Sequence, residues 1–150
     1  MNYKHRINIT QKFHYTMNVK SENRNLNKRI GLPLLVWGAI NMLAGIFTLF
    51  SPSELIRGVL LQAFFWGLID GILGLGIFLR KKEFDLEKIK KILLVNVYLD
   101  VGYVVVGILL ILFGGNAFLM GNGLGVIIQG LFLFIVDLIH YRHIEKTLVQ

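Results

Sequence analysis

The chain has 150 residues, of which 55% are hydrophobic and only 17% are charged, and its mean hydropathy is +0.62. Ordinary soluble domains carry about 25% charged residues. This composition therefore excludes a disordered chain and argues against a soluble globular domain. Because the sequence has no cysteine, it also excludes disulfides, Cys-ligated zinc, iron–sulfur clusters and a thiol nucleophile.

Residues 1–30 form a basic segment that contains seven Lys and Arg residues. Between Ile7 and Lys20, apolar and polar residues mostly alternate, which is typical of a half-buried strand, although a lone strand is not stable. We expect a basic cytoplasmic tail that lies near the anionic headgroups of the inner leaflet. Met17 offers an alternative start of translation, in which case part of the alternation is accidental.

Four long apolar segments follow this tail, and none carries charges every three or four positions as the outer face of a soluble helix does. Each is close to the roughly 20 residues that a helix needs to cross about 30 Å of hydrocarbon. The segments are residues 32–50, 59–79, 92–113 and 124–141. The sequence predicts an all-α, four-helix transmembrane bundle over residues 31–143, followed by a cytoplasmic tail at 144–150. A cleaved signal peptide fits the first segment poorly, because no small-x-small cleavage site follows Phe50.

The positive charges predict the orientation of these spans. Four crossings place 15 of the 16 Lys and Arg residues on one side and Arg57 alone on the other. We expect the protein to lie in the plasma membrane. By the positive-inside rule, both termini and the connection 80–91 are then expected to be cytoplasmic, and connections 51–58 and 114–123 external. Within 80–91, Asp85 is expected to cap a helix, and Glu87 precedes Lys91 by the four residues of a helical ion pair.

An internal repeat relates the two predicted helical hairpins. The run Gly58–Gln62 matches Gly125–Gln129, and Asp70 and Asp137 each follow the glutamine by eight residues. The first and third spans align less well. Such a tandem pseudo-repeat predicts two hairpins related by an axis along the membrane normal, as in some transporters. Chance similarity among helices rich in Leu, Ile and Val is the alternative.

Polar side chains inside the apolar spans are the first place to look for function in a membrane protein. Here they recur three or four residues apart, so each span has one polar face, and four such faces are expected to converge inside the bundle. The candidate residues are Asn41, Gln62, Asp70, Asn96, Asp100, Tyr103, Gln129, Asp137 and His140.

The three carboxylates among them have no Lys or Arg within any span. At about 1.5 Å of rise per residue, Asp70 and Asp100 lie about 14 Å from the cytoplasmic boundary and are expected to face each other. Asp137 and Asn96 lie about 7 Å deep on the same scale. Burial without a cation favours a protonated Asp, an Asp pair that shares one proton, or a bound cation. The alternative is a set of neutral groups that hydrogen-bond between helices.

Other sequence features carry less chemistry. His140 and His143 are more typical of a polar rim than of a haem or metal site, so no cofactor is expected. Catalytic motifs are missing, and we expect neither an enzyme nor a nucleic-acid partner. Gly67-x3-Gly71 and Gly121-x3-Gly125 have the small-xxx-small spacing of close helix packing, and Gly121-x-Gly123 is placed in a loop before the last span.

Three patterns carry a family resemblance: the run Leu35–Asn41, the spacing Asn96-x3-Asp100-x2-Tyr103, and the segment Ile128–His140. Over about residues 32–143 the chain resembles a small uncharacterised family of four-span prokaryotic integral membrane proteins. The resemblance implies the topology and no activity. The residues themselves favour two hypotheses over a third, a membrane enzyme. The chain is a small proton- or cation-coupled transport or channel protein, alone or as a homo-oligomer, or it is a non-catalytic accessory or assembly subunit of a membrane complex.

Overall fold

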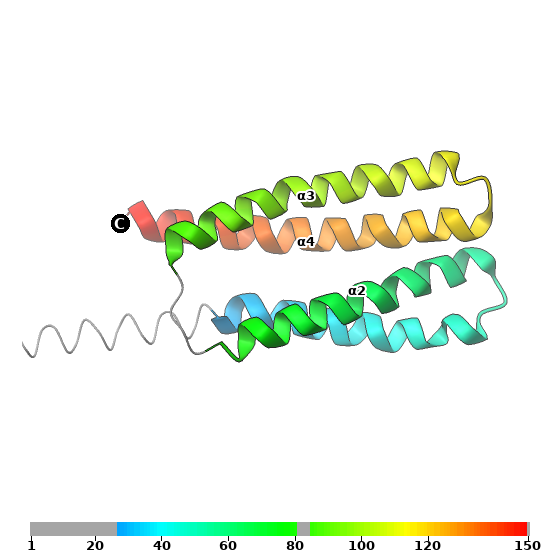
Figure 1. Cartoon of the computed structure of the whole chain (residues 1–150), viewed down its shortest axis with the longest axis horizontal. Helices are drawn as coiled ribbons and strands as arrows, with labels where there is room; N and C mark the ends of the chain where they lie inside the picture. Colours follow the sequence, from blue (N-terminus) through cyan, green and yellow to red (C-terminus); the bar gives the residue numbers. More distant parts are fainter. Residues whose placement is uncertain (1–26, 81–84, 150) are drawn as a thin grey trace, which may run out of the picture.

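The computed structural model describes residues 27–80 and 85–149, and the alternating pattern of residues 7–20 lies outside them. This part of the chain contains four helices and no strand. The helices run side by side along the long axis of the molecule (Figure 1). They are the first helix, Asn27–Phe50, which ends in the 3₁₀ turn η1 (Phe47–Phe50), then α2 (Glu54–Phe78), α3 (Leu86–Phe113) and α4 (Ala117–Val149). All four are long and apolar enough to cross a membrane, which suggests a multi-pass membrane protein.

Side-chain caps determine where three of the helices begin. The Ser53 hydroxyl accepts a hydrogen bond from the Ile56 amide at 3.5 Å, and the Asn116 side chain accepts from the Leu119 amide at 2.9 Å. The predicted cap at Asp85 is confirmed, because its carboxylate accepts from the Lys88 amide at 3.2 Å. Such caps satisfy amides that have no partner inside the helix.

These caps correct the predicted external connections. The helices extend past the apolar segments, so the connections shrink from 51–58 and 114–123 to residues 51–53 and 114–116. Gly115, at φ 72°, supplies the turn before α4. The placement of Gly121 and Gly123 in a loop is wrong, because both lie in the second turn of α4 and are buried.

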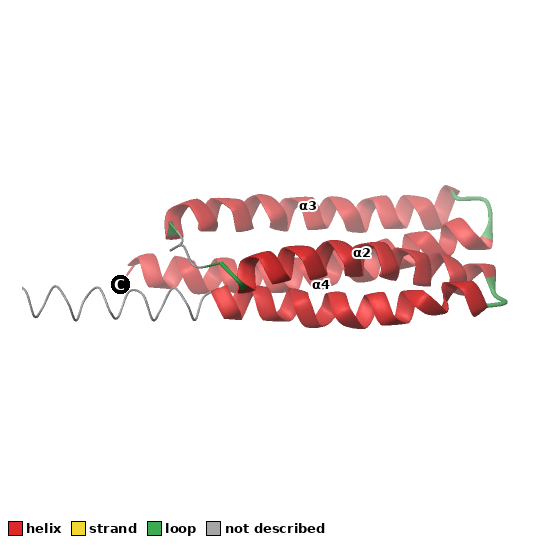
Figure 2. Ribbon diagram, turned by 60° about the horizontal axis from the view of Figure 1, so that its bottom comes forward, coloured by secondary structure: helices red, strands yellow, loops and turns green. Residues whose placement is uncertain are grey.

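The four helices are not packed equally. α4 contacts α2 and α3, whereas the backbones of α2 and α3 do not approach each other although they follow one another in the chain. Figure 1 shows the first helix beside α2 and α3 beside α4, and Figure 2 shows α3 set apart from α2. α4 is accordingly the most buried of the four helices.

The first helix meets α2 along glycines spaced seven residues apart, Gly31, Gly38 and Gly45, which we call the glycine seam. A Cβ atom on Gly38 would lie 2.5 Å from the Gly71 nitrogen and 2.8 Å from the Gly67 oxygen. Real Cβ atoms do not come this close to backbone, so only glycine permits the contact. The two backbones therefore touch directly.

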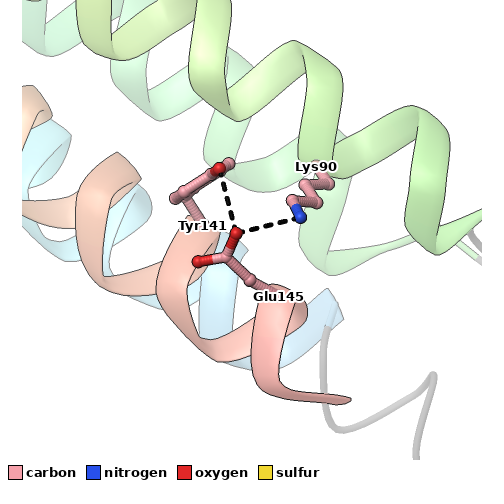
Figure 3. Close-up of polar contacts among 3 residues, drawn as sticks. All are labelled: Lys90, Tyr141 and Glu145. Atoms are coloured by element: carbon pink, nitrogen blue, oxygen red, sulfur yellow. Dashed lines mark hydrogen bonds and ion pairs between the residues drawn. The ribbon is translucent and has the colours of Figure 1, made fainter. Parts of the chain in front are cut away.

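Polar and apolar contacts join the helices at the end near residue 85. Ile30, Leu93 and Ile144 form a buried apolar cluster from the first helix, α3 and α4. Beside it, the Lys90 ammonium lies 3.0 Å from the Glu145 carboxylate, and the Tyr141 hydroxyl donates to the same carboxylate at 3.3 Å (Figure 3).

The predicted ion pair within α3 is not formed, since Glu87 and Lys91 make no such contact in the described part of the chain. Both side chains are exposed to solvent. Lys90 instead faces α4, so the ion pair in this region connects two helices.

Candidate functional site

A cavity of about 360 Å³ lies between α2 and α3, and side chains of α4 and of the first helix complete its lining. Most of its lining is aliphatic. Its polar side chains are Asp70 from α2, Asn96, Asp100 and Tyr103 from α3, and Asp137 from α4. Among the described residues, no Lys, Arg or His lines this cavity. We call it the acidic cavity.

Asp100 is the least satisfied group in the acidic cavity. Its side chain is only 2% exposed, and its Oδ2 atom has no hydrogen-bond partner among the described residues. Gly130 of α4 allows the close approach, because a Cβ there would lie 3.1 Å from the Asp100 carbonyl oxygen. A buried, unpaired carboxylate is strongly destabilising, so this site favours a proton or a positively charged partner.

Asp70, in contrast, is held by a chain of hydrogen bonds through three helices. The Gln129 amide of α4 donates to the Asp70 carboxylate of α2, and the Gln129 carbonyl accepts from the Trp37 indole of the first helix at 2.9 Å. Trp37 also stacks on Phe132, with ring centroids 4.2 Å apart. Asp70 and Asp100 line the same cavity, but Asp70 makes its hydrogen bond to Gln129 and not to Asp100.

Asp137 occupies the part of the cavity nearer the connection between α2 and α3. It is 7% exposed, and Asn96 of α3 lies beside its carboxyl group. One turn further along α4, His140 is outside the cavity lining. Its Nδ1 lies 2.6 Å from the Val136 oxygen and its Nε2 3.0 Å from the Arg29 oxygen, so His140 joins α4 to the first helix.

Aromatic side chains border the acidic cavity at one end of the bundle, and apolar side chains border it at the other. The rings of Trp66 and Tyr103 meet edge to face, with centroids 5.1 Å apart, one turn beyond Asp70 and Asp100. At the opposite end, Ile30 and Leu93 of the apolar cluster line the cavity. The remaining side faces outward between α2 and α3, where apolar side chains such as Leu73 are half exposed.

Two further predicted site residues, like His140, lie away from the cavity. The Asn41 amide donates to the Trp37 carbonyl of its own helix at 2.9 Å. Gln62 donates to Asn122 at 2.8 Å, between α2 and α4. Five of the nine candidates thus line the cavity, and Gln129 supports it by its hydrogen bond to Asp70. Gln62 and His140 join two helices, whereas Asn41 bonds within its own helix.

Sequence reasoning missed two buried polar residues. Asn122, 7% exposed, lies seven residues before Gln129 on the same face of α4, a spacing that would have found it had this segment been assigned to a helix. Asn27, 4% exposed, donates to the Arg80 carbonyl at 2.8 Å. It lies in the basic segment, where no periodic apolar pattern marks it.

The arrangement determines which ligands fit. Across the described residues, no group of three His, Asp or Glu side chains is placed to hold a metal ion. The three aspartates are spread along the cavity, and His140 and His143 make separate contacts, the latter with the Arg29 guanidinium at 3.3 Å. The cavity is suited to protons or to a cation held by few direct contacts.

A model of the family of unknown function DUF6992 matches residues 33–138 of the chain. The match covers more than half of the sequence, so the chain belongs to this family. No curated protein and no solved structure matches the chain.

Proposed function

We propose that this member of DUF6992 is a multi-pass plasma-membrane protein that moves protons or a small cation past the acidic cavity. The observation that carries the proposal is Asp100, which is 2% exposed and has an unpaired carboxyl oxygen. A carboxylate at membrane depth costs several kcal/mol unless it is protonated or paired. No basic side chain of the described residues lines the cavity, so a proton or an external cation takes that role.

The proposed orientation places both termini in the cytoplasm. It is supported by the 15 Lys and Arg residues on the side of the termini and of residues 80–91, against Arg57 on the other. Because the chain has no cysteine, single cysteines report the side directly. In intact bacterial cells, a membrane-impermeant maleimide should label Ala117→Cys and leave Lys146→Cys unlabelled until the cells are opened. The reverse pattern would contradict the orientation.

We also propose that the two hairpins are a tandem repeat. The equivalent glycines Gly58 and Gly125 both lie where α2 meets α4: a Cβ on Gly58 would clash with the Phe118 oxygen, and one on Gly125 would lie 2.5 Å from the Gln62 Cβ. A two-fold axis along the membrane normal relates α2 to α4, which supports a shared contact face between these two helices.

Transport is tested with the purified full-length chain in liposomes. Under an imposed pH gradient or a Na⁺ or K⁺ gradient, flux should exceed that of empty liposomes, and Asp100→Asn should lower it at least tenfold. Asp85→Asn is the matched control, because it removes a carboxylate at an exposed helix cap where Asn caps equally well. Flux that is absent in the unaltered chain, or unchanged in Asp100→Asn, would contradict the proposal.

A second candidate is a non-catalytic accessory or assembly subunit, and the Trp37–Gln129–Asp70 chain favours it. These hydrogen bonds join three helices, as expected of polar groups whose role is to hold a bundle together. On this alternative, Asp70→Asn and Asp100→Asn change thermal stability and recovery of the native membrane complex, and no flux is measured for any variant.

A further inference from the structure

We infer that the ligand of the acidic cavity is an amphipathic organic ammonium ion, which enters sideways from the bilayer between α2 and α3. This inference deepens the proposed transport function and rests on it for the movement of the ligand. Binding of the ligand is a separate property of the cavity and can be measured without transport.

The polar part of the cavity requires a positively charged hydrogen-bond donor. The Asp100 Oδ2 atom is buried and unpaired, whereas Asp70 already accepts from Gln129. An ammonium group supplies both the N–H donor and the positive charge that Asp100 lacks. Among the described residues, no three acidic or His side chains are grouped to hold a metal ion, so the three aspartates do not surround one point. The cavity therefore suits an ammonium group better than a metal ion that needs several ligands.

The Trp66–Tyr103 pair adds a second feature that suits an ammonium ion. Both aromatic side chains line the cavity one turn from the carboxyls, and their rings meet edge to face. Aromatic faces attract ammonium groups when the cation is within about 6 Å of the ring centre. A cation bound in the cavity therefore has both a carboxyl group and aromatic side chains among its neighbours.

The open side of the cavity is apolar and requires a hydrophobic tail. Ile69 and Leu73 on α2 are 45% and 54% exposed, and Ile92 and Leu99 on α3 are 50% and 52% exposed. These four side chains border the opening between helices whose backbones do not meet. The Trp66–Tyr103 pair borders the cavity at one end and the apolar cluster borders it at the other. The route to Asp100 that we infer therefore passes between the half-exposed aliphatic side chains of the open side.

The size of the cavity favours a small molecule over a protein helix. Its volume of about 360 Å³ is at the lower end of the range of small-molecule sites, about 300–1,000 Å³. A membrane-spanning helix is about 10 Å across and about 30 Å long and would not enter without separating α2 from α3 further. Occupation of the opening by a second copy of the chain is an outcome that the test detects.

The test measures binding of hexylammonium to the full-length chain in lipid nanodiscs, followed by tryptophan fluorescence and corrected with empty nanodiscs. We expect saturable binding of hexylammonium, at least tenfold weaker binding of methylammonium, which lacks the tail, and no saturable binding of neutral hexanol. Asp100→Asn should weaken hexylammonium binding at least tenfold, and Asp85→Asn should leave it unchanged. Equal binding of hexylammonium and hexanol, or no effect of Asp100→Asn, would overturn the inference.

The sideways route is tested separately with a matched pair of variants. Leu73→Trp narrows the opening, whereas Ile72→Trp adds the same side chain at a neighbouring, exposed position outside the cavity lining. Hexylammonium should bind at least fivefold more slowly to Leu73→Trp than to Ile72→Trp. Equal association rates would refute entry between α2 and α3.

The two proposals fail in different ways. Proton flux that depends on Asp100, without hexylammonium binding, overturns the ligand assignment and leaves transport standing. Asp100-dependent binding without any flux supports the ligand assignment and contradicts transport. If cysteines placed at Ile69 and Ile92 cross-link two copies of the chain and hexylammonium does not compete, the opening is an interface between copies and the inference is wrong.

Discussion

The contact between the first helix and α2 differs from the relation between α2 and α3, although all three helices are apolar enough to cross a membrane. Along the glycine seam, the backbones of the first helix and α2 touch. α2 and α3 leave a cavity between them, bridged by the rings of Trp66 and Tyr103. Hydrophobicity does not distinguish these pairs, because lipid tails are as apolar as the helices. The glycines of the first helix and α2 distinguish them, because they allow the backbones of that pair to touch.

One helix, α2, shows both behaviours on its two sides. Gly67 and Gly74 face the first helix and permit direct contact, whereas Trp66 and Asp70 line the acidic cavity. Asp70 and Asp100 thus line the space in which the backbones of α2 and α3 do not meet. The same helix is able to serve as a structural partner on one side and as a wall of a binding site on the other.

The largest effect on stability is expected when a side chain fills the glycine seam and separates the first helix from α2. Gly38→Leu places a side chain against Gly67 and Gly71 backbone and should lower the free energy of unfolding by about 3 kcal/mol or more, measured by denaturation with SDS in mixed micelles. Gly102→Ala is the control, because a Cβ there meets nothing within 4 Å, and it should stabilise α3 by up to about 1 kcal/mol. Similar losses in both variants would refute the role of the seam.

The hydrogen-bond chain behind the cavity should give the next largest effect. Asp70→Leu leaves the Gln129 amide without its acceptor and should cost about 1–3 kcal/mol of unfolding free energy. Asp70→Asn retains an oxygen acceptor and should cost clearly less in the same denaturation experiment. If the two substitutions are equivalent, Gln129 does not depend on this hydrogen bond.

Removing the aromatic bridge should have a smaller effect on stability. The edge-to-face pair Trp66–Tyr103 should contribute about 0.5–1.5 kcal/mol of coupling. A double-mutant cycle with Trp66→Leu and Tyr103→Leu measures this coupling. A coupling near zero would show that this ring contact does not help to hold α2 and α3 in place.

The smallest effect is expected at the ion pair near residue 85. Lys90 and Glu145 join α3 to α4 at a partly exposed position (Figure 3), and such pairs contribute about 0–1 kcal/mol. Lys90→Gln and Glu145→Gln, alone and together, should reveal a coupling in this range that falls as salt is added. A coupling free energy as large as the loss of unfolding free energy in Asp70→Leu would contradict the expected ranking of these contacts.

The existence of four helices was predictable because long apolar segments leave few alternatives for a chain of this composition. The helix starts were less predictable, since Asn116 and Ser53 cap helices in segments that read as loops. The seven-residue spacing of Gly31, Gly38 and Gly45 is visible in the sequence, but it does not say which helix it faces. Contacts between helices depend on their three-dimensional arrangement.

The acidic cavity was predictable only in part for the same reason. The distances of Asp70 and Asp100 from the basic connection 80–91 along the sequence predicted a similar depth for both, and both line the cavity. Periodicity within one helix did not reveal that Gln62 pairs with Asn122 or that Gln129 takes the hydrogen bond of Asp70. Which neighbour a polar side chain meets depends on the rotation of each helix about its own axis, and glycine contacts set this rotation.

The two connections of three residues each, 51–53 and 114–116, leave little polypeptide at one end of the bundle. A protease, an antibody or a partner protein finds almost no epitope there. At the opposite end, α4 continues to Val149 and the side chains of Lys90 and Glu145 are accessible. Among the described residues, this end of the bundle therefore offers more polypeptide outside the apolar helices to a macromolecule than the end with the two short connections does.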